Sequence, residues 1–167
     1  MEPNPNPYAA PASTVQESVA PQAAPALWNP NAAALWCLLF SPVFGAYLQM
    51  RNWQALGEPE KAQTSWYWCV GTLVTVLVLI GVGMVLPDEH WFQKLGNRSG
   101  FIMLIAWYMS HGKLQIAYVK ERYGKDYPRK GWGAPLGIAV ACMVALFVFI
   151  VGAAIVLAAL GVTQLPQ

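Results

Sequence analysis

The sequence predicts an all-α membrane protein with about four transmembrane helices and a disordered, proline-rich N-terminal tail. Three observations lead to this class. The chain of 167 residues is 56% hydrophobic and only 11% charged, which is less than half the roughly 25% charged share of a soluble domain. The apolar residues are grouped into long runs, as lipid requires. Five of the ten Lys and Arg residues fall within 120–132, between two of these runs.

The tail is expected to cover residues 1–31. Its prolines lie among Ala, Asn, Ser and Gln residues, and such a segment buries too little apolar surface to offset the entropy of ordering. It lacks the basic and apolar regions of a cleavable signal peptide. Residues 162–167 are expected to form a short C-terminal tail, which leaves one helical membrane domain over 32–161.

The first span is expected at residues 32–50, with Asn29 or Asn31 as its N-cap. A helix of this length rises about 28 Å, just enough for the hydrocarbon core. Pro42 lies near its middle and predicts a kink or a break, with Ser41 placed to satisfy a freed backbone group. A re-entrant hairpin is the alternative for this segment.

Three further spans are expected at about 66–86, 101–119 and 134–161. The second is uncharged and is followed by Pro87, which cannot continue a helix. The third is the most polar, because Ser110, His111 and Lys113 crowd its second half. Lys113 can extend its ammonium to the nearby interface. The last is long enough to tilt in the bilayer or project from it.

Small residues recur every fourth position at the start of the last span: Gly133, Gly137, Ala141 and Ala145. Such a stripe lets two helix backbones approach closely in lipid. We expect it to pack within one chain, with homo-oligomerisation through this face as the alternative.

The distribution of basic residues predicts the topology. With four spans, loops 51–65 and 110–133 share one face and hold eight Lys and Arg, whereas the other face holds only Lys94 and Arg98. Because short loops rich in Lys and Arg stay cytoplasmic, we expect these two loops in the cytoplasm and both termini in the periplasm. A re-entrant first segment would move only the N-terminal tail to the other side.

Candidate chemistry is sparse. Ser41 and His111 lie on different spans, as in an intramembrane serine protease, but Ser41 precedes a proline and lacks a Gly-x-Ser-x-Gly elbow. His90 and His111 have no metal-ligand spacing around them. No Asp or Glu falls within a span, which weighs against proton-coupled transport. We therefore expect no catalytic, cofactor-binding or metal-binding residues, no cofactor, no nucleic acid partner and no enzyme activity. The cysteines are expected to be small buried hydrophobes.

A resemblance adds to these inferences. It is carried by Trp28-Asn29-Pro30, Trp36, Leu38-Leu39-Phe40, Pro42, Phe44-Gly45-Ala46 and Asn52-Trp53-Gln54-Ala55-Leu56-Gly57, and later by Tyr118-Val119, Tyr123-Gly124, Tyr127 and Gly131-Trp132. This pattern resembles small polytopic bacterial inner-membrane proteins, a kind that includes immunity proteins to toxins of type VI secretion. It covers residues 28–132 and implies no catalytic residue.

The resemblance implies a multi-pass inner-membrane protein that binds an antibacterial toxin at the bilayer and thereby neutralises it. Neutralisation of this kind requires a surface and a location rather than a chemical site. The alternative function is a small transport or channel-like component, or an accessory subunit. A membrane enzyme has the least support.

Overall fold

The computed structural model describes residues 23–85 and 91–161, and the regular elements within these ranges are helices joined by short loops. The helices are α1 (Pro30–Phe40), α2 (Pro42–Ala55), α3 (Pro59–Val85), α4 (Trp91–Trp107), the π-helical turn η1 (Tyr108–Gly112), α5 (Lys113–Tyr123) and α6 (Gly133–Ala159). The predicted all-α class is therefore confirmed. Residues 1–22 of the expected tail, residues 86–90 with His90, and residues 162–167 lie outside the described ranges.

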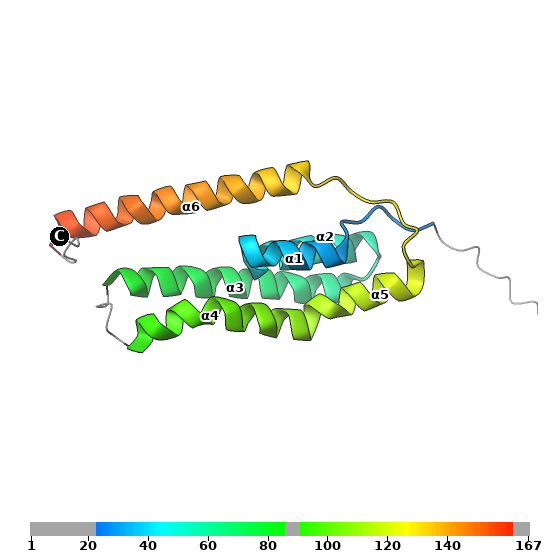
Figure 1. Cartoon of the computed structure of the whole chain (residues 1–167), viewed down its shortest axis with the longest axis horizontal. Helices are drawn as coiled ribbons and strands as arrows, with labels where there is room; N and C mark the ends of the chain where they lie inside the picture. The colour runs from blue at the N-terminus through cyan, green and yellow to red at the C-terminus, as the bar shows by residue number, and fades with distance from the viewer. Residues whose placement is uncertain (1–22, 86–90, 162–167) are drawn as a thin grey trace, which may run out of the picture.

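The segment expected as the first span is divided into α1 and α2 at Ser41. The predicted break at Pro42 is confirmed, since Pro42 is the first residue of α2. Figure 1 shows α2 running back alongside α1, so the two form a helical hairpin, as in the re-entrant alternative. At 11 residues, α1 rises only about 16 Å, too short to cross a core of about 30 Å.

The start of the hairpin follows from local capping. The Asn29 side chain accepts a hydrogen bond from the Asn31 amide at 3.0 Å, and Pro30 occupies the first turn of α1. Proline suits this position because its missing N–H would have no helical partner there. Of the two expected N-caps, the structure therefore selects Asn29.

Among residues 23–85 and 91–161, two helices are long and apolar enough to cross a membrane, namely α3 and α6. Each has 27 residues, and their most apolar windows have mean hydropathies of 2.3 and 3.0. Each rises about 40 Å, more than the hydrocarbon core needs. The spans expected at 66–86 and 134–161 thus correspond to helices, although α3 begins seven residues earlier than expected, at Pro59.

The third expected span, 101–119, is the middle of a longer helical rod, which we call the α4–α5 rod (residues 91–123). The spans expected at 66–86 and 101–119 leave 87–100 as a connector, and for 91–100 this expectation is wrong, because these residues are the first turns of α4. Mixed charges mark an exposed surface equally well on a loop or on a helix. The crowded polar residues at 108–112 form the π-helical turn, a feature often found as a single turn inside α-helices.

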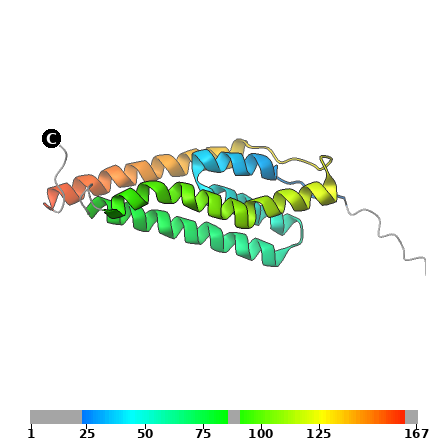
Figure 2. The same ribbon diagram turned by 60° about the horizontal axis from the view of Figure 1, so that its bottom comes forward.

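The helices are arranged so that the loops gather at two ends. The α2–α3 turn, the end of α5 and the segment before α1 lie at one end, while the end of α3, the start of α4 and the end of α6 lie at the other (Figures 1 and 2). We call the first the basic end, because the loop at 124–132 belongs to it.

The segment before α1 is hydrogen-bonded at the basic end. Leu27 donates to the Pro128 carbonyl and accepts from the Lys130 amide, both at 2.9 Å. We expected the N-terminal tail on the opposite face from this loop. That expectation does not hold for Leu27, because a hydrogen-bonded pair must lie on the same side of a bilayer.

The core lies between the hairpin, α3 and the α4–α5 rod. Trp107 is fully buried and packs with Cys37, Ala46 and Cys69. The expectation of buried cysteines is thus confirmed for Cys37 and Cys69, whereas Cys142 is exposed within the chain.

The small-residue stripe does not pack within the chain as expected. A Cβ added at Gly133 or Gly137 would meet no atom within 4 Å, and Ala141 and Ala145 are exposed. The buried positions of α6 are instead Pro135 and Ala139. A small stripe permits close approach, but the face that is used depends on the shape of the partner, and here the facing surface carries bulky aromatic residues.

Ser41 adopts φ 83° and ψ 162° at the tip of the hairpin, a region that is nearly restricted to glycine. We expect Ser41→Gly to raise stability by about 1 kcal/mol, because the backbone strain is relieved. Thermal unfolding in detergent measures this change. Ser110→Gly is the control and is expected to lower stability by about 0.5–1 kcal/mol, since Ser110 lies inside a helical turn. A loss of stability with Ser41→Gly as large as the control's would contradict the strain.

Candidate functional site

Three buried amide side chains meet at the basic end of the fold. Gln49 and Asn52 lie on α2 and Gln115 lies on α5, and none is more than 1% exposed. We call these three residues the amide cluster. Buried amides require hydrogen-bond partners, because an unpaired amide inside a protein costs about 1–3 kcal/mol. Their partners therefore show what the cluster does.

Asn52 binds the backbone of the segment that precedes α1. Its Nδ2 donates to the Trp28 carbonyl at 2.8 Å, and its Oδ1 accepts from the Trp28 amide at 3.1 Å. The side chain thereby satisfies both backbone groups of one residue, as a neighbouring strand would. The Nδ2 also donates to Gln115 Oε1 at 3.1 Å, which joins this pair to the α4–α5 rod.

The two glutamines tie α2 to the rod. Gln115 Nε2 donates to the Gln49 carbonyl, and Gln49 Nε2 donates to the Gly112 carbonyl, each at 3.0 Å. Gly112 ends the π-helical turn, where backbone carbonyls can leave the regular helical pattern. Within the described residues, Gln49 Oε1 has no partner. The cluster therefore fastens the hairpin to the rod through side chains more than 60 positions apart in sequence.

The segment before α1 is held at a second point by the loop 124–132, which we call the basic loop. Trp28 Nε1 donates to the Gly131 carbonyl at 3.0 Å, and the Lys130 ammonium lies 4.4 Å from the centre of the Trp28 ring. A cation over an indole face is attracted by the ring quadrupole. Trp28 therefore links α2, through Asn52, to the loop that leads into α6.

A group of aromatic and charged side chains also lies at the basic end, around Lys61. The Lys61 ammonium lies 5.0 Å from the Trp53 ring centre and 4.6 Å from that of Tyr118, and it pairs with Glu58 at 3.1 Å. Hydrogen bonds from the Tyr118 hydroxyl and from Lys61 hold the pKa of Glu58 below its ordinary value. Because the folded state lowers this pKa, the stabilisation is present at neutral pH and is lost as the pH falls through the acidic range.

The residues considered for catalysis have separate surroundings. Ser41 lies at the hairpin tip, whereas the His111 ring packs against Trp68 at 6.1 Å between centroids. Ser110 donates to the Ala106 carbonyl at 2.6 Å, a bond that satisfies a helical serine. Lys113 is exposed. The Ser41 side chain, which was expected to satisfy a backbone group freed by Pro42, makes no capping hydrogen bond to α2.

A cavity of about 400 Å³ lies beside the hairpin tip. Cys37, Ser41 and Thr72 contribute polar atoms to a lining that is otherwise apolar apart from backbone. Thr72 is 1% exposed, and its Oγ1 has no hydrogen-bond partner among the residues that the structure describes. By contrast, Thr64, Ser65 and Thr75 on the same helix each donate to the carbonyl four residues earlier. Thr72 is thus the exception on α3 and marks the tip cavity as the second candidate site.

The part of the chain that the structure describes contains no assembled set of metal ligands. No group of three or more His, Cys, Asp or Glu side chains is found among residues 23–85 and 91–161. The amide cluster was not predicted from the sequence. Gln49 and Gln115 nevertheless indicate it, because they are polar amides inside expected spans. Such residues are costly in lipid unless they are paired.

The residues that carry the resemblance to small inner-membrane proteins have structural roles in this fold. Asn52 joins the segment before α1, at Trp28, to the rod, at Gln115. Gly45 packs closely against Cys37 and Trp107, and Gly57 and Gly124 adopt positive φ. The pattern therefore encodes how the hairpin is held, and it contains no reactive group at these positions.

Comparisons of the chain with protein-family models, with curated proteins and with solved structures find no match. The fold and the two candidate sites define an all-α protein with a buttressed helical hairpin and two helices that could span a membrane.

Proposed function

We propose that the protein is a non-enzymatic binding protein of a bacterial inner membrane, and that it serves as an immunity protein against a membrane-acting toxin of type VI secretion. The observation that supports this proposal most is that the buried polar side chains hold the fold together, while large apolar side chains remain exposed. The amide cluster is engaged in holding the hairpin, while large apolar side chains are exposed along α3, α4 and α6. A binder needs such a stable surface at membrane depth.

The proposed topology has three crossings and one re-entrant hairpin. The crossings are α3, the α4–α5 rod and α6, and the hairpin enters from the basic end. Eight of the ten Lys and Arg residues lie in 51–61 and 113–130, the segments nearest that end, and Lys94 and Arg98 are the other two. Because Lys- and Arg-rich short loops stay cytoplasmic, Leu27 and the loop 124–132 would be cytoplasmic and the end of α6 periplasmic.

The test is a growth competition between a toxin-producing strain and a recipient that lacks this gene, with each variant restored. We expect Ser41→Ala, His111→Ala and Lys113→Ala to protect fully, because none of these residues performs chemistry in the proposal. Trp91→Ala is expected to reduce protection severalfold, since Trp91 is 66% exposed at the periplasmic end and exposed aromatic anchors often dominate binding.

The matched control is Trp66→Ala, which removes a 46%-exposed tryptophan nearer the basic end and is expected to leave protection intact. Membrane insertion of every variant is checked by immunoblotting of membrane fractions. If the recipient without the gene suffers no disadvantage, the immunity role is wrong.

A transport or channel-like role is the second candidate, and the tip cavity favours it. Helices broken at membrane depth often bind solutes in transporters, and irregular backbone there lies against protein or a water-filled cavity. In the same competition, Thr72→Val keeps the size of the side chain and removes its hydroxyl. Loss of protection by inserted Thr72→Val or His111→Ala would favour this second role over toxin binding.

A further inference from the structure

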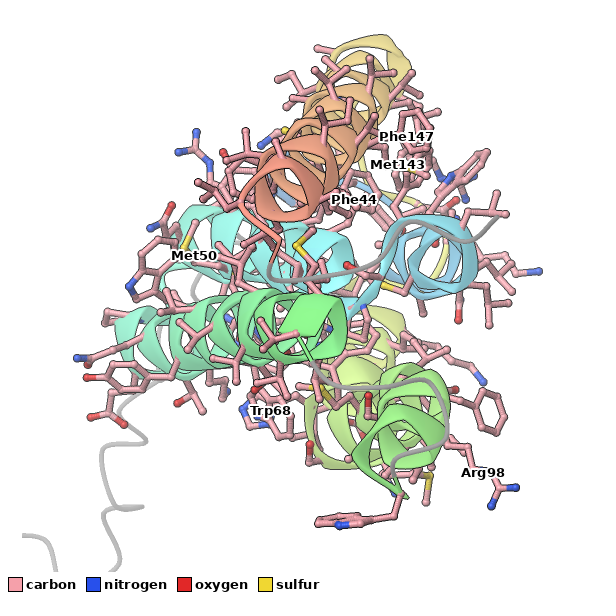
Figure 3. All side chains as sticks on the ribbon, turned by 90° about the vertical axis from the view of Figure 1, so that its left-hand side faces the viewer. Phe44, Met50, Trp68, Arg98, Met143 and Phe147 are labelled. Atoms are coloured by element: carbon pink, nitrogen blue, oxygen red, sulfur yellow. The ribbon has the colours of Figure 1, made fainter. Side chains whose placement is uncertain are left out.

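A long apolar groove lies between α6 and the rest of the fold. It has a volume of about 410 Å³ and is lined by the hairpin tip, by α3 and by the first half of α6. Figure 3 looks along the helices and shows α6 standing above the hairpin and α3, with Phe44 labelled on the side that faces α6. The volume lies within the range of about 300–1,000 Å³ that is common for ligand pockets.

The lining determines the class of ligand. Its side chains are apolar except for the hydroxyls of Ser41 and Tyr47 and the thiols of Cys69 and Cys142. An ion or a polar solute would lose its hydration there without compensation. A hydrocarbon chain would instead replace empty space with favourable contacts.

The length of the groove corresponds to one leaflet. On α6 the lining runs from Pro135 to Leu146, which is about 16 Å along a helix axis. Half of a hydrocarbon core of about 30 Å is about 15 Å. A whole helix about 10 Å wide and 16 Å long would occupy on the order of 1,200 Å³, so the groove accommodates a thinner chain.

A free cation lies at the mouth of the groove. Phe44 and Tyr47 line it, and Arg51 follows Tyr47 by one turn on the same face of α2, toward the basic end. Arg51 is exposed, and no hydrogen bond, ion pair or ring contact engages its guanidinium within the described residues. Lys130, in contrast, is occupied by the Trp28 ring. An arginine fork suits a phosphate group, which it can bind through two parallel hydrogen bonds.

We propose that this groove binds one acyl chain of an anionic glycerophospholipid from the leaflet at the basic end, with the lipid phosphate at Arg51. The charge at the mouth, the apolar lining and the one-leaflet length are each satisfied by this single ligand. The site depends on the membrane location proposed above, but it does not depend on the immunity role.

The test is native mass spectrometry of the full chain after reconstitution in nanodiscs of equal phosphatidylglycerol and phosphatidylcholine and release from them. We expect one retained phosphatidylglycerol, favoured over phosphatidylcholine by about tenfold. Both lipids carry a phosphate, but the quaternary ammonium of phosphatidylcholine offsets the phosphate charge that Arg51 binds, whereas phosphatidylglycerol keeps its net negative charge. Arg51→Gln is expected to abolish the preference, and its control Lys125→Gln to preserve it. Cys142→Phe places a ring in the groove and is expected to remove the bound lipid.

Ala141→Phe is the control for Cys142→Phe, because Ala141 is the neighbouring exposed residue outside the lining. Circular dichroism confirms that each variant is folded, and Arg51→Gln tests the site even if the phenylalanine variants are not. The proposal is overturned if the wild-type protein retains no lipid, whether as a monomer or as a dimer, or if it retains both lipids equally. It is also overturned if Cys142→Phe and Ala141→Phe lose the same amount of bound lipid. Since no toxin is present, these outcomes are independent of the competition experiment.

Discussion

Replacing Asn52 with alanine is expected to destabilise the protein by about 2–4 kcal/mol. The side chain makes three hydrogen bonds, two to the Trp28 backbone and one to Gln115. Each buried group left unpaired costs about 1–3 kcal/mol in water-soluble proteins, whereas hydrogen bonds between membrane helices average nearer 0.6 kcal/mol. Three hydrogen bonds at about 0.6 kcal/mol each give about 2 kcal/mol, and one buried group left unpaired at about 2 kcal/mol raises the sum to about 4 kcal/mol. Thermal unfolding in detergent measures it.

Gln54→Ala is the matched control for this substitution. Gln54 is an exposed amide on the same helix, and its loss is expected to change stability by less than about 0.5 kcal/mol. A double-mutant cycle with Gln115→Ala should show coupling of about 0.5 kcal/mol or more, because the two amides are in contact. Equal effects of Asn52→Ala and Gln54→Ala would mean that the amide cluster does not hold the hairpin.

The same substitution should release the segment before α1. Leu27 would keep its two bonds to the basic loop, but Trp28 would lose its attachment to α2. Hydrogen exchange at the Trp28 amide should therefore accelerate while exchange in the middle of α3 stays slow, since local opening needs less free energy than global unfolding.

The helices that depend on composition alone were predicted well. The uncharged runs that form most of α3 and α6 can be found in the sequence without knowing which helices pack against them, because each charged residue in lipid has its own free-energy cost. The break at Pro42 was also predictable, since proline lacks the N–H that a helix requires. The direction of the chain after the break was not, because a kink and a reversal share the same local sequence.

The long-range features could not be predicted from the sequence. Asn52 and Gln115 are 63 positions apart, and no local pattern shows that they meet. The stripe at Gly137 and Ala141 follows a true helical period, yet α6 turns Ala139 toward the hairpin instead. Periodicity identifies a face of a helix, whereas the identity of its neighbour depends on how distant segments pack.

Gly45→Ala is expected to destabilise the protein by about 1–3 kcal/mol, the usual cost of overpacking a core. A Cβ at Gly45 would lie against Cys37 Sγ and 2.7 Å from Cη2 of Trp107, closer than real Cβ contacts allow. Trp107 is fully buried, so its ring has little room to move. The hairpin helices would have to separate, and unfolding in detergent would occur at a lower temperature.

Two further variants show whether this close approach is the cause. Cys37→Ala removes the sulfur that is nearest to the added methyl group, so the double variant Gly45→Ala/Cys37→Ala should recover part of the stability that Gly45→Ala loses. Gly137→Ala is the control, because no atom lies within 4 Å of its added Cβ. It is expected to be neutral or to stabilise α6 by up to about 1 kcal/mol, as alanine does in place of glycine inside a helix. If Cys37→Ala gives no recovery, the close approach to Cys37 is not the cause of the loss. If Gly137→Ala proves as harmful as Gly45→Ala, the stripe on α6 is a tightly packed interface as well.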